Sequence, residues 1–131
     1  MNLFFEDGGS FKTALILQKA GEAFQVEMPG GRRAKVRARD VVFEYASPDI
    51  ASFAGETAQL MEELDISFLW EAAEGREFDY TELGKEYFGR EMTPVEAASL
   101  LMKLHAFPMY FYKTGRGRYT AEPAESLNAA L

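Results

Sequence analysis

The stretch Thr93–Pro123, TPVEAASLLMKLHAFPMYFYKTGRGRYTAEP, combines a helix with a β-hairpin and sets the fold class. Thr93 is a favourable helix cap, and Pro94 suits the first helical position. Glu96 can bond back to the cap, which completes a capping box. After the helix, aromatic and β-rich runs flank Thr114–Gly117 and predict a hairpin. A helix that leads into a hairpin is typical of a helix-turn-helix with a β wing.

Three further helices are expected upstream of this stretch. Ser47 as cap, with Pro48 first in the helix, begins the first of them. A second begins near Asp65. A third begins at Asp79, where Glu82 completes another capping box. With the hairpin, these helices outline a winged-helix domain.

The segment before the helices has strand periodicity. β-forming runs are separated by turn residues at Asp7–Ser10, Gly21 and Pro29–Gly31. Short strands at intervals of about ten residues predict an antiparallel meander closed into a small SH3-like barrel. The predicted fold class is therefore α+β.

We expect three parts: the SH3-like β-barrel in residues 1–48, the winged-helix domain with its β wing in residues 49–121, and a helix start in residues 122–131. The last helix meets no glycine or basic turn before Leu131, so we expect the natural protein to continue into a downstream domain. Residues 1–48 contain seven Lys or Arg and six Asp or Glu, a net charge of +1. Residues 49–131 contain seven and fifteen, a net charge of −8, so the two parts are expected to meet different partners.

The composition excludes several classes of site. The chain has no cysteine and one histidine, which excludes disulfides, thiolate nucleophiles and multi-histidine metal centres. That histidine, His105, follows a helix end, where its imidazolium would complement the helix dipole. The carboxylates of Glu62, Glu63 and Asp65 point to different sides of a helix and are interpreted as a solvated acidic face. We therefore expect no catalytic residue, metal site or cofactor in this chain.

Targeting signals are also absent from the sequence. No apolar run approaches the length that a membrane helix needs, and the first residues lack the basic and apolar regions of a signal peptide. We expect a cytoplasmic protein with no membrane partner.

One stretch of this acidic chain is rich in cations. In an extended strand, Arg33, Lys35, Arg37 and Arg39 point to one side, with Arg32 next to them. Their spacing of about 6.6–7 Å is close to the repeat of a single-stranded nucleic-acid backbone. This predicts a phosphate-binding surface. The alternative interpretations are a solvated strand face, an edge protected by charge, or cations neutralised by carboxylates on neighbouring strands.

The predicted wing is a second basic site. Lys113, Arg116 and Arg118 lie close in sequence to three tyrosines, and single-strand binders use this mixture of charge and aromatic rings. The alternative interpretation is that Tyr110 and Tyr112, which share a strand face, pack on the helices. The candidate recognition helix offers only Glu96, Ser99 and Lys103 on a thin polar stripe, so sequence-specific DNA binding is not expected.

Nearly the whole chain resembles the N-terminal region of bacterial ribonuclease II and ribonuclease R (RNB) family proteins. The residues that carry the resemblance are MNLFFEDGGSFKTALIL at the start, KVRARDVVFEYASP, FLWEAA, LGKEYFG, the stretch Thr93–Pro123 quoted above, and ESLNAAL at the end. The resemblance implies a parent enzyme that degrades RNA from the 3′ end, with magnesium held by an aspartate cluster in an RNB domain. Neither that cluster nor that domain occurs in this sequence, and no catalytic residue is carried over.

Two hypotheses follow from the sequence. In the first, the chain is a non-catalytic accessory region that contacts single-stranded RNA weakly through these cations and adjoins its own downstream catalytic domain. In the second, it is a protein-interaction or scaffold module that docks a partner through its acidic winged-helix half.

Overall fold

The computed structural model describes the chain from Met1 to Ala130, with side chains up to Leu127. The expected lack of a helix terminator at Leu131 lies outside the described residues. The chain divides into two compact units, Met1–Gly55 and Glu56–Leu131, which are described separately. The boundary predicted between residues 48 and 49 falls in the connection between the last strand of the first unit and the helix that follows it.

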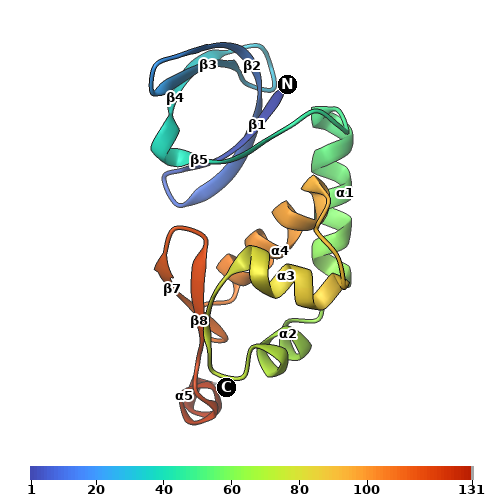
Figure 1. Cartoon of the computed structure of the whole chain (residues 1–131), viewed down its shortest axis with the longest axis vertical. Coiled ribbons are helices and arrows are strands. Elements are labelled where there is room, and N and C mark those ends of the chain that lie inside the picture. Colours follow the sequence, from blue (N-terminus) through green and yellow to red (C-terminus); the bar gives the residue numbers. More distant parts are fainter. Residues whose placement is uncertain (131) are drawn as a thin grey trace. The chain divides into compact units, whose positions relative to one another are not determined.

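The first unit is a five-stranded antiparallel sheet in the order β4-β3-β2-β1-β5. The chain runs through β1 (Asn2–Asp7), β2 (Ser10–Ala20), β3 (Ala23–Glu27), β4 (Arg33–Arg37), the 3-10 turn η1 (Ala38–Asp40) and β5 (Val41–Tyr45). The sheet curls strongly on itself (Figure 1). The antiparallel meander predicted from the sequence is therefore confirmed.

Closure of this sheet into a barrel was also expected, and the hydrogen bonding does not extend that far. Within residues 1–130, β4 and β5 are the two edges and do not pair with each other. The reason is local, because η1 ends β4 at Arg37 and β5 returns to pair with β1. The sheet is curled but open.

Two apolar clusters hold this unit together. Inside the curl, buried residues from four strands form the core: Leu3, Phe5, Ala14, Phe24, Val26 and Val36. The other face of β1 is also buried, because Phe4 lies against Phe43 and against Phe53 of helix α1 (Ile50–Glu63). The rings of Phe53 and Tyr45 stack with their centroids 4.2 Å apart. Helix α1 therefore begins by covering the outer side of β1 and β5.

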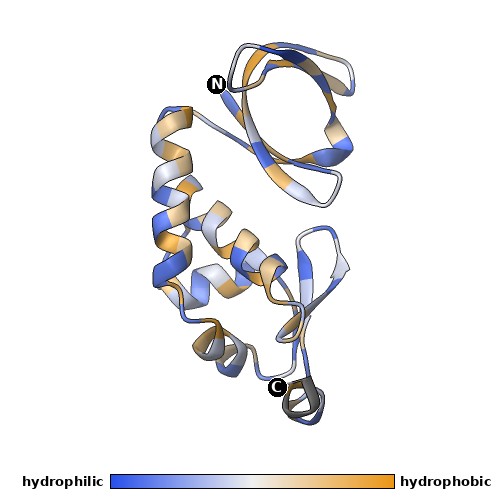
Figure 2. Cartoon of the chain, turned by 180° about the vertical axis from the view of Figure 1, so that it is seen from behind, coloured by the Kyte–Doolittle hydropathy of each residue, from blue (hydrophilic) through white to orange (hydrophobic). Residues whose placement is uncertain are grey.

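The second unit combines helices with a three-stranded antiparallel sheet in the order β6-β8-β7. After α1 the chain forms α2 (Ile66–Ala73), β6 (Glu77–Asp79), α3 (Tyr80–Phe88), α4 (Pro94–Ala106), β7 (Phe111–Gly115), β8 (Arg118–Ala121) and α5 (Ala124–Ala130). Hydrophobic and hydrophilic residues alternate along α1 (Figure 2). The buried core of the unit is apolar. Its fully buried side chains include Leu69, Phe78, Leu83, Leu100, Leu104, Phe111 and Tyr119.

The helix starts follow the sequence signals with one exception. Both predicted capping boxes are present, Asp79 with Glu82 and Thr93 with Glu96. The predicted start of α1 is wrong. Its cap is Asp49, whose Oδ1 accepts the N–H of Ser52 at 2.9 Å, and the Ser47–Pro48 peptide, which is cis, precedes the helix. Aspartate and serine are equally good helix caps. Ser47 was expected as the cap because Pro48 would then be the first helical residue, and this choice placed the start of the helix too early.

Within residues 1–130, none of the helices combines the length and the apolar character needed to cross a bilayer.

Candidate nucleic-acid interface

Three cations lie on the solvent side of strand β4. Along this strand Arg33, Lys35 and Arg37 are exposed, while Ala34 is partly buried and Val36 is buried. The alternation arises because neighbouring side chains of a strand point to opposite faces, and Ala34 and Val36 face the core. Arg33, Lys35 and Arg37 are hereafter called the basic ridge. The predicted alternation is confirmed over these residues.

The alternation ends sooner than the sequence predicted. Arg39 lies in the 3-10 turn η1, not in the strand, so it does not continue the row. It lines an open cleft of about 300 Å³ with Arg37, Ala38 and Glu22. Arg32, at the other end, is exposed just before β4 begins. The ridge thus has three members, with one arginine beyond each end.

The carboxylates of the first unit do not neutralise the ridge. Asp7 binds Lys12, with Oδ2 and Nζ 2.7 Å apart. The Lys12 hydrogen bond lowers the pKa of the Asp7 carboxyl, and the charge of Arg32 lowers it further. Glu44 lies 3.8 Å from Lys19. In the described part of the chain, no side-chain hydrogen bond or ion pair joins a ridge residue to another residue.

The neighbouring strand adds one negative charge to the flank of the ridge. In the β3–β4 register, Glu27 lies opposite Arg33, Gln25 opposite Lys35, and Ala23 opposite Arg37. The face made by the two strands therefore carries three cations and one carboxylate, with an amide between them. Gln25 was not identified from the sequence as a neighbour of the ridge. The turn at Pro29–Gly31 predicts a hairpin between the two strands and could have indicated that Gln25 lies opposite Lys35.

The basic residues of the wing lie in the other unit. Arg118 is committed to two carboxylates: its guanidinium lies 3.3 Å from Glu77 and 3.9 Å from Glu82. Glu77 also accepts from Thr114, and this hydrogen bond, followed by that of Arg118, lowers the pKa of its carboxyl. Lys113 is exposed on β7, and Arg116 is exposed in the turn before β8. Both have interactions with other residues.

The tyrosines of the wing differ in their surroundings. Tyr119 is buried, and its hydroxyl lies 3.0 Å from Nδ1 of His105. Tyr110 packs edge-on against Trp70. Tyr112 is 44% exposed. Packing on the helices, the alternative considered for Tyr110 and Tyr112, therefore describes Tyr110 but not Tyr112, whose ring is open. His105, which was expected to follow the helix end, lies within the last turn of α4.

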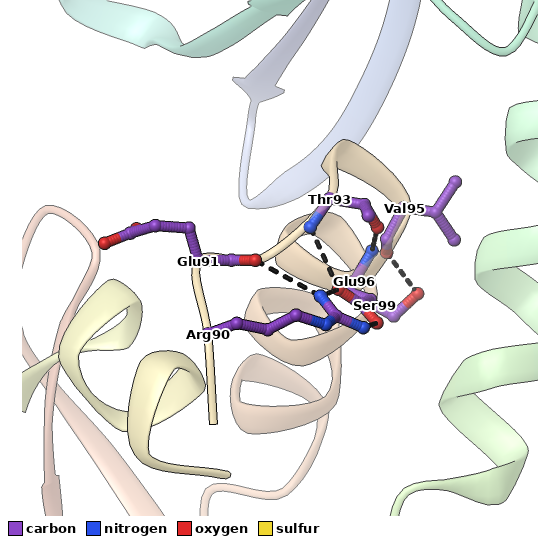
Figure 3. A network of polar contacts seen from close by, with 6 residues as sticks. All are labelled: Arg90, Glu91, Thr93, Val95, Glu96 and Ser99. Carbon is purple, nitrogen blue, oxygen red and sulfur yellow. Dashed lines mark hydrogen bonds and ion pairs between the residues drawn. The ribbon is translucent and has the colours of Figure 1, made fainter. Parts of the chain in front are cut away.

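Helix α4 has little free polar surface. Six of its 13 residues are buried, including Ser99, whose hydroxyl donates to the Val95 carbonyl at 2.6 Å. Glu96 is held by Arg90 and Thr93, as Figure 3 shows. A helix that reads bases in the major groove needs several free donors and acceptors. The geometry of α4 does not supply them.

In residues 1–130, no group of three or more His, Asp or Glu side chains is arranged to hold a metal ion. Comparison with protein families, with curated proteins and with solved structures gives no match. The function of the basic ridge therefore has to be inferred from its geometry and charge.

Proposed function

We propose that the basic ridge binds the phosphate backbone of single-stranded RNA and does not read base sequence. The observation that supports this most is the row Arg33, Lys35 and Arg37, whose charged groups share one side of β4 and have no carboxylate partner in the described residues. Strand geometry spaces these side chains by about 6.6–7 Å, near the phosphate repeat of an extended single strand. Each phosphate contact releases counterions, which gives affinity without sequence preference.

The proposal extends to the role of the whole chain. We infer a non-catalytic N-terminal accessory region of an RNB-family 3′-to-5′ exoribonuclease, on the strength of the sequence resemblance together with this surface. On this view the first unit is an SH3-like module whose sheet is curled but open, supported by the order of its strands and the 3-10 turn before β5. The second is a winged helix, supported by α4 followed by the β7–β8 hairpin. Cleavage and its magnesium belong to the catalytic domain of that enzyme. Arg32 and Arg39 extend the ridge within the first unit. Lys113, Arg116 and Arg118 of the second unit are a separate and weaker candidate contact for RNA.

A second candidate function has an observation of its own. On α2, the ring of Phe68 is 54% exposed and packs edge-on against Tyr87 of α3. Two exposed carboxylates adjoin it: Asp65, the N-cap of α2, whose Oδ1 accepts the N–H of Phe68, and Glu71, one helical turn later. An exposed aromatic ring with acidic surroundings suits a basic protein partner. Co-purification of a basic partner that is lost on Phe68→Ser would support this function.

RNA binding is tested by fluorescence anisotropy with a labelled oligouridylate at low salt. The variant Arg33→Gln/Lys35→Gln/Arg37→Gln should lose at least about tenfold in affinity, because each lost phosphate contact removes a favourable electrostatic contribution. The matched control is Lys12→Gln/Lys19→Gln/Lys85→Gln, which removes the same charge from residues that are paired with carboxylates. Equal losses in the two variants would contradict the proposal.

A further inference from the structure

We propose that the open edge of β4 is a docking site for an extended acidic peptide of a partner protein. The peptide has Asp or Glu at every second position, with small apolar residues between them, and adds to the sheet as a sixth strand. The inference goes beyond RNA contact, because it uses the backbone of β4 as well as the ridge side chains.

The hydrogen-bond phase of β4 decides which backbone groups face the open edge. The N–H of Met28 donates to the carbonyl of Arg32 at 2.7 Å. Bonded and non-bonded pairs alternate along an antiparallel ladder. Arg33 and Lys35 therefore belong to the non-bonded pairs, and their N–H and C=O groups point away from β3. The N–H of Arg37 also points away from β3, and Arg37 is the N-cap residue of the turn η1.

These outward groups have no backbone partner within residues 1–130, where β4 is an edge of the sheet. An unpaired edge is a template for another strand. A second copy of β4 is a poor occupant, because it would place cations directly opposite cations. A strand that carries carboxylates opposite Arg33, Lys35 and Arg37 satisfies both the backbone and the charges.

The backbone favours a peptide over a nucleic acid at the edge itself. Arg33 and Lys35 each present an N–H and a C=O group in the same direction. A peptide strand matches this alternation with its own acceptors and donors. Phosphates can accept from the N–H groups but are repelled by the carbonyl oxygens. RNA would therefore engage the ridge side chains and leave the backbone edge unused.

A hollow beside β4 fits the alternate side chains of such a peptide. Its volume is about 110 Å³, and Phe5, Met28, Ala34 and Val36 line it. Residues of β1 and β4 meet there although the two strands do not pair, and the apolar lining residues belong to the core inside the curl or pack against it. Its polar lining consists of Arg32 and Lys35 together with the carboxylates of Glu6, Asp7 and Asp40, and these three carboxylates disfavour an acidic side chain. Small neutral residues are thus expected at the positions between the carboxylates.

The test uses the full chain and a short fluorescein-labelled peptide in which Asp and Val alternate. An isomer with all Asp before all Val has the same charge and composition. Lys35→Gln removes the charge and keeps the edge N–H, whereas Lys35→Pro removes both, and an edge strand tolerates proline where its N–H faces outward. Lys35→Pro should bind the alternating peptide about fivefold more weakly than Lys35→Gln, the effect of one hydrogen bond. The two variants should bind oligouridylate alike.

Methylated peptides give an independent readout if Lys35→Pro does not fold. Methyl groups on the Asp amides, which face β4, should abolish binding, whereas methyl groups on the Val amides should leave most of it. Equal binding of the alternating and block peptides, or of the two methylated peptides, would overturn the proposal. Binding of oligouridylate without binding of the alternating peptide would also overturn it and leave the proposed function standing. Binding of the alternating peptide without binding of oligouridylate would contradict the proposed function and leave the peptide proposal standing.

Discussion

Glu27 lies directly opposite Arg33 in the β3–β4 register, yet in the described part of the chain the two side chains form no ion pair. The carboxylate therefore lowers the potential along the basic ridge without occupying a cation.

Glu27→Gln should strengthen RNA binding about twofold at low salt. A unit charge about 7 Å away contributes roughly 0.5 kcal/mol in water before screening. Anisotropy titrations with labelled oligouridylate measure the change. Glu44→Gln is the control, because Glu44 lies on β5 at the opposite edge of the sheet and pairs with Lys19. An equal gain in both variants would mean that net charge, and not the ridge, attracts the RNA.

Glu96→Gln should lower the free energy of unfolding by about 1 kcal/mol near neutral pH. The Glu96 carboxylate accepts from both Nη atoms of Arg90, at 2.7 and 2.8 Å, and from the N–H of Thr93 at 2.9 Å. Glutamine keeps the shape and loses the charge. Urea denaturation measures the loss. A double-mutant cycle with Arg90→Gln should find most of it shared between the two residues, and simple additivity would contradict the assignment.

The same pair predicts a pH dependence. The hydrogen bond from Arg90 is the main reason that the pKa of Glu96 lies below its usual value of 4.5. A depressed carboxyl pKa adds stability above the unfolded pKa, and this stability is lost as the pH falls through the folded pKa. The difference in unfolding free energy between the wild type and Glu96→Gln should therefore be full near neutral pH and shrink below about pH 4. A difference that stays constant in acid would be evidence against the ion pair.

Phe53→Ala should destabilise the first unit by about 3 kcal/mol. The ring is 2% exposed and stacks on Tyr45 beside Phe4, so its removal leaves a cavity on the outer side of the sheet. Urea denaturation followed by circular dichroism measures the effect. Phe68→Ala removes an equally large ring that is 54% exposed, and it should cost about 0.5 kcal/mol. Similar losses in the two variants would show that Phe53 does not anchor α1 to the sheet.

The sequence predicted those features of the fold that depend on neighbouring residues. The capping boxes at Asp79 and Thr93 need only residues three positions apart, and both are present. The alternation of Arg33, Lys35 and Arg37 follows from strand geometry alone. These parts were accessible because their causes are local.

Features that depend on distant pairing were missed. Strand β6 has three residues and exists because it pairs with β8. The open edge of β4 depends on β5 pairing elsewhere, and the position of Arg39 depends on the turn η1. The ion pairs that occupy Arg118 join it to Glu77 and Glu82, far away in the sequence. A sequence pattern predicts which residues are cations but not which of them find a carboxylate.

The salt dependence of RNA binding tests the central claim most directly. Three phosphate contacts on a single strand predict a slope of about −2 for the logarithm of the association constant against the logarithm of the salt concentration. Replacing Arg33, Lys35 and Arg37 by glutamine should bring that slope close to zero. If the triple variant retains the slope of the wild type, the ridge does not contact the phosphates and the account is wrong.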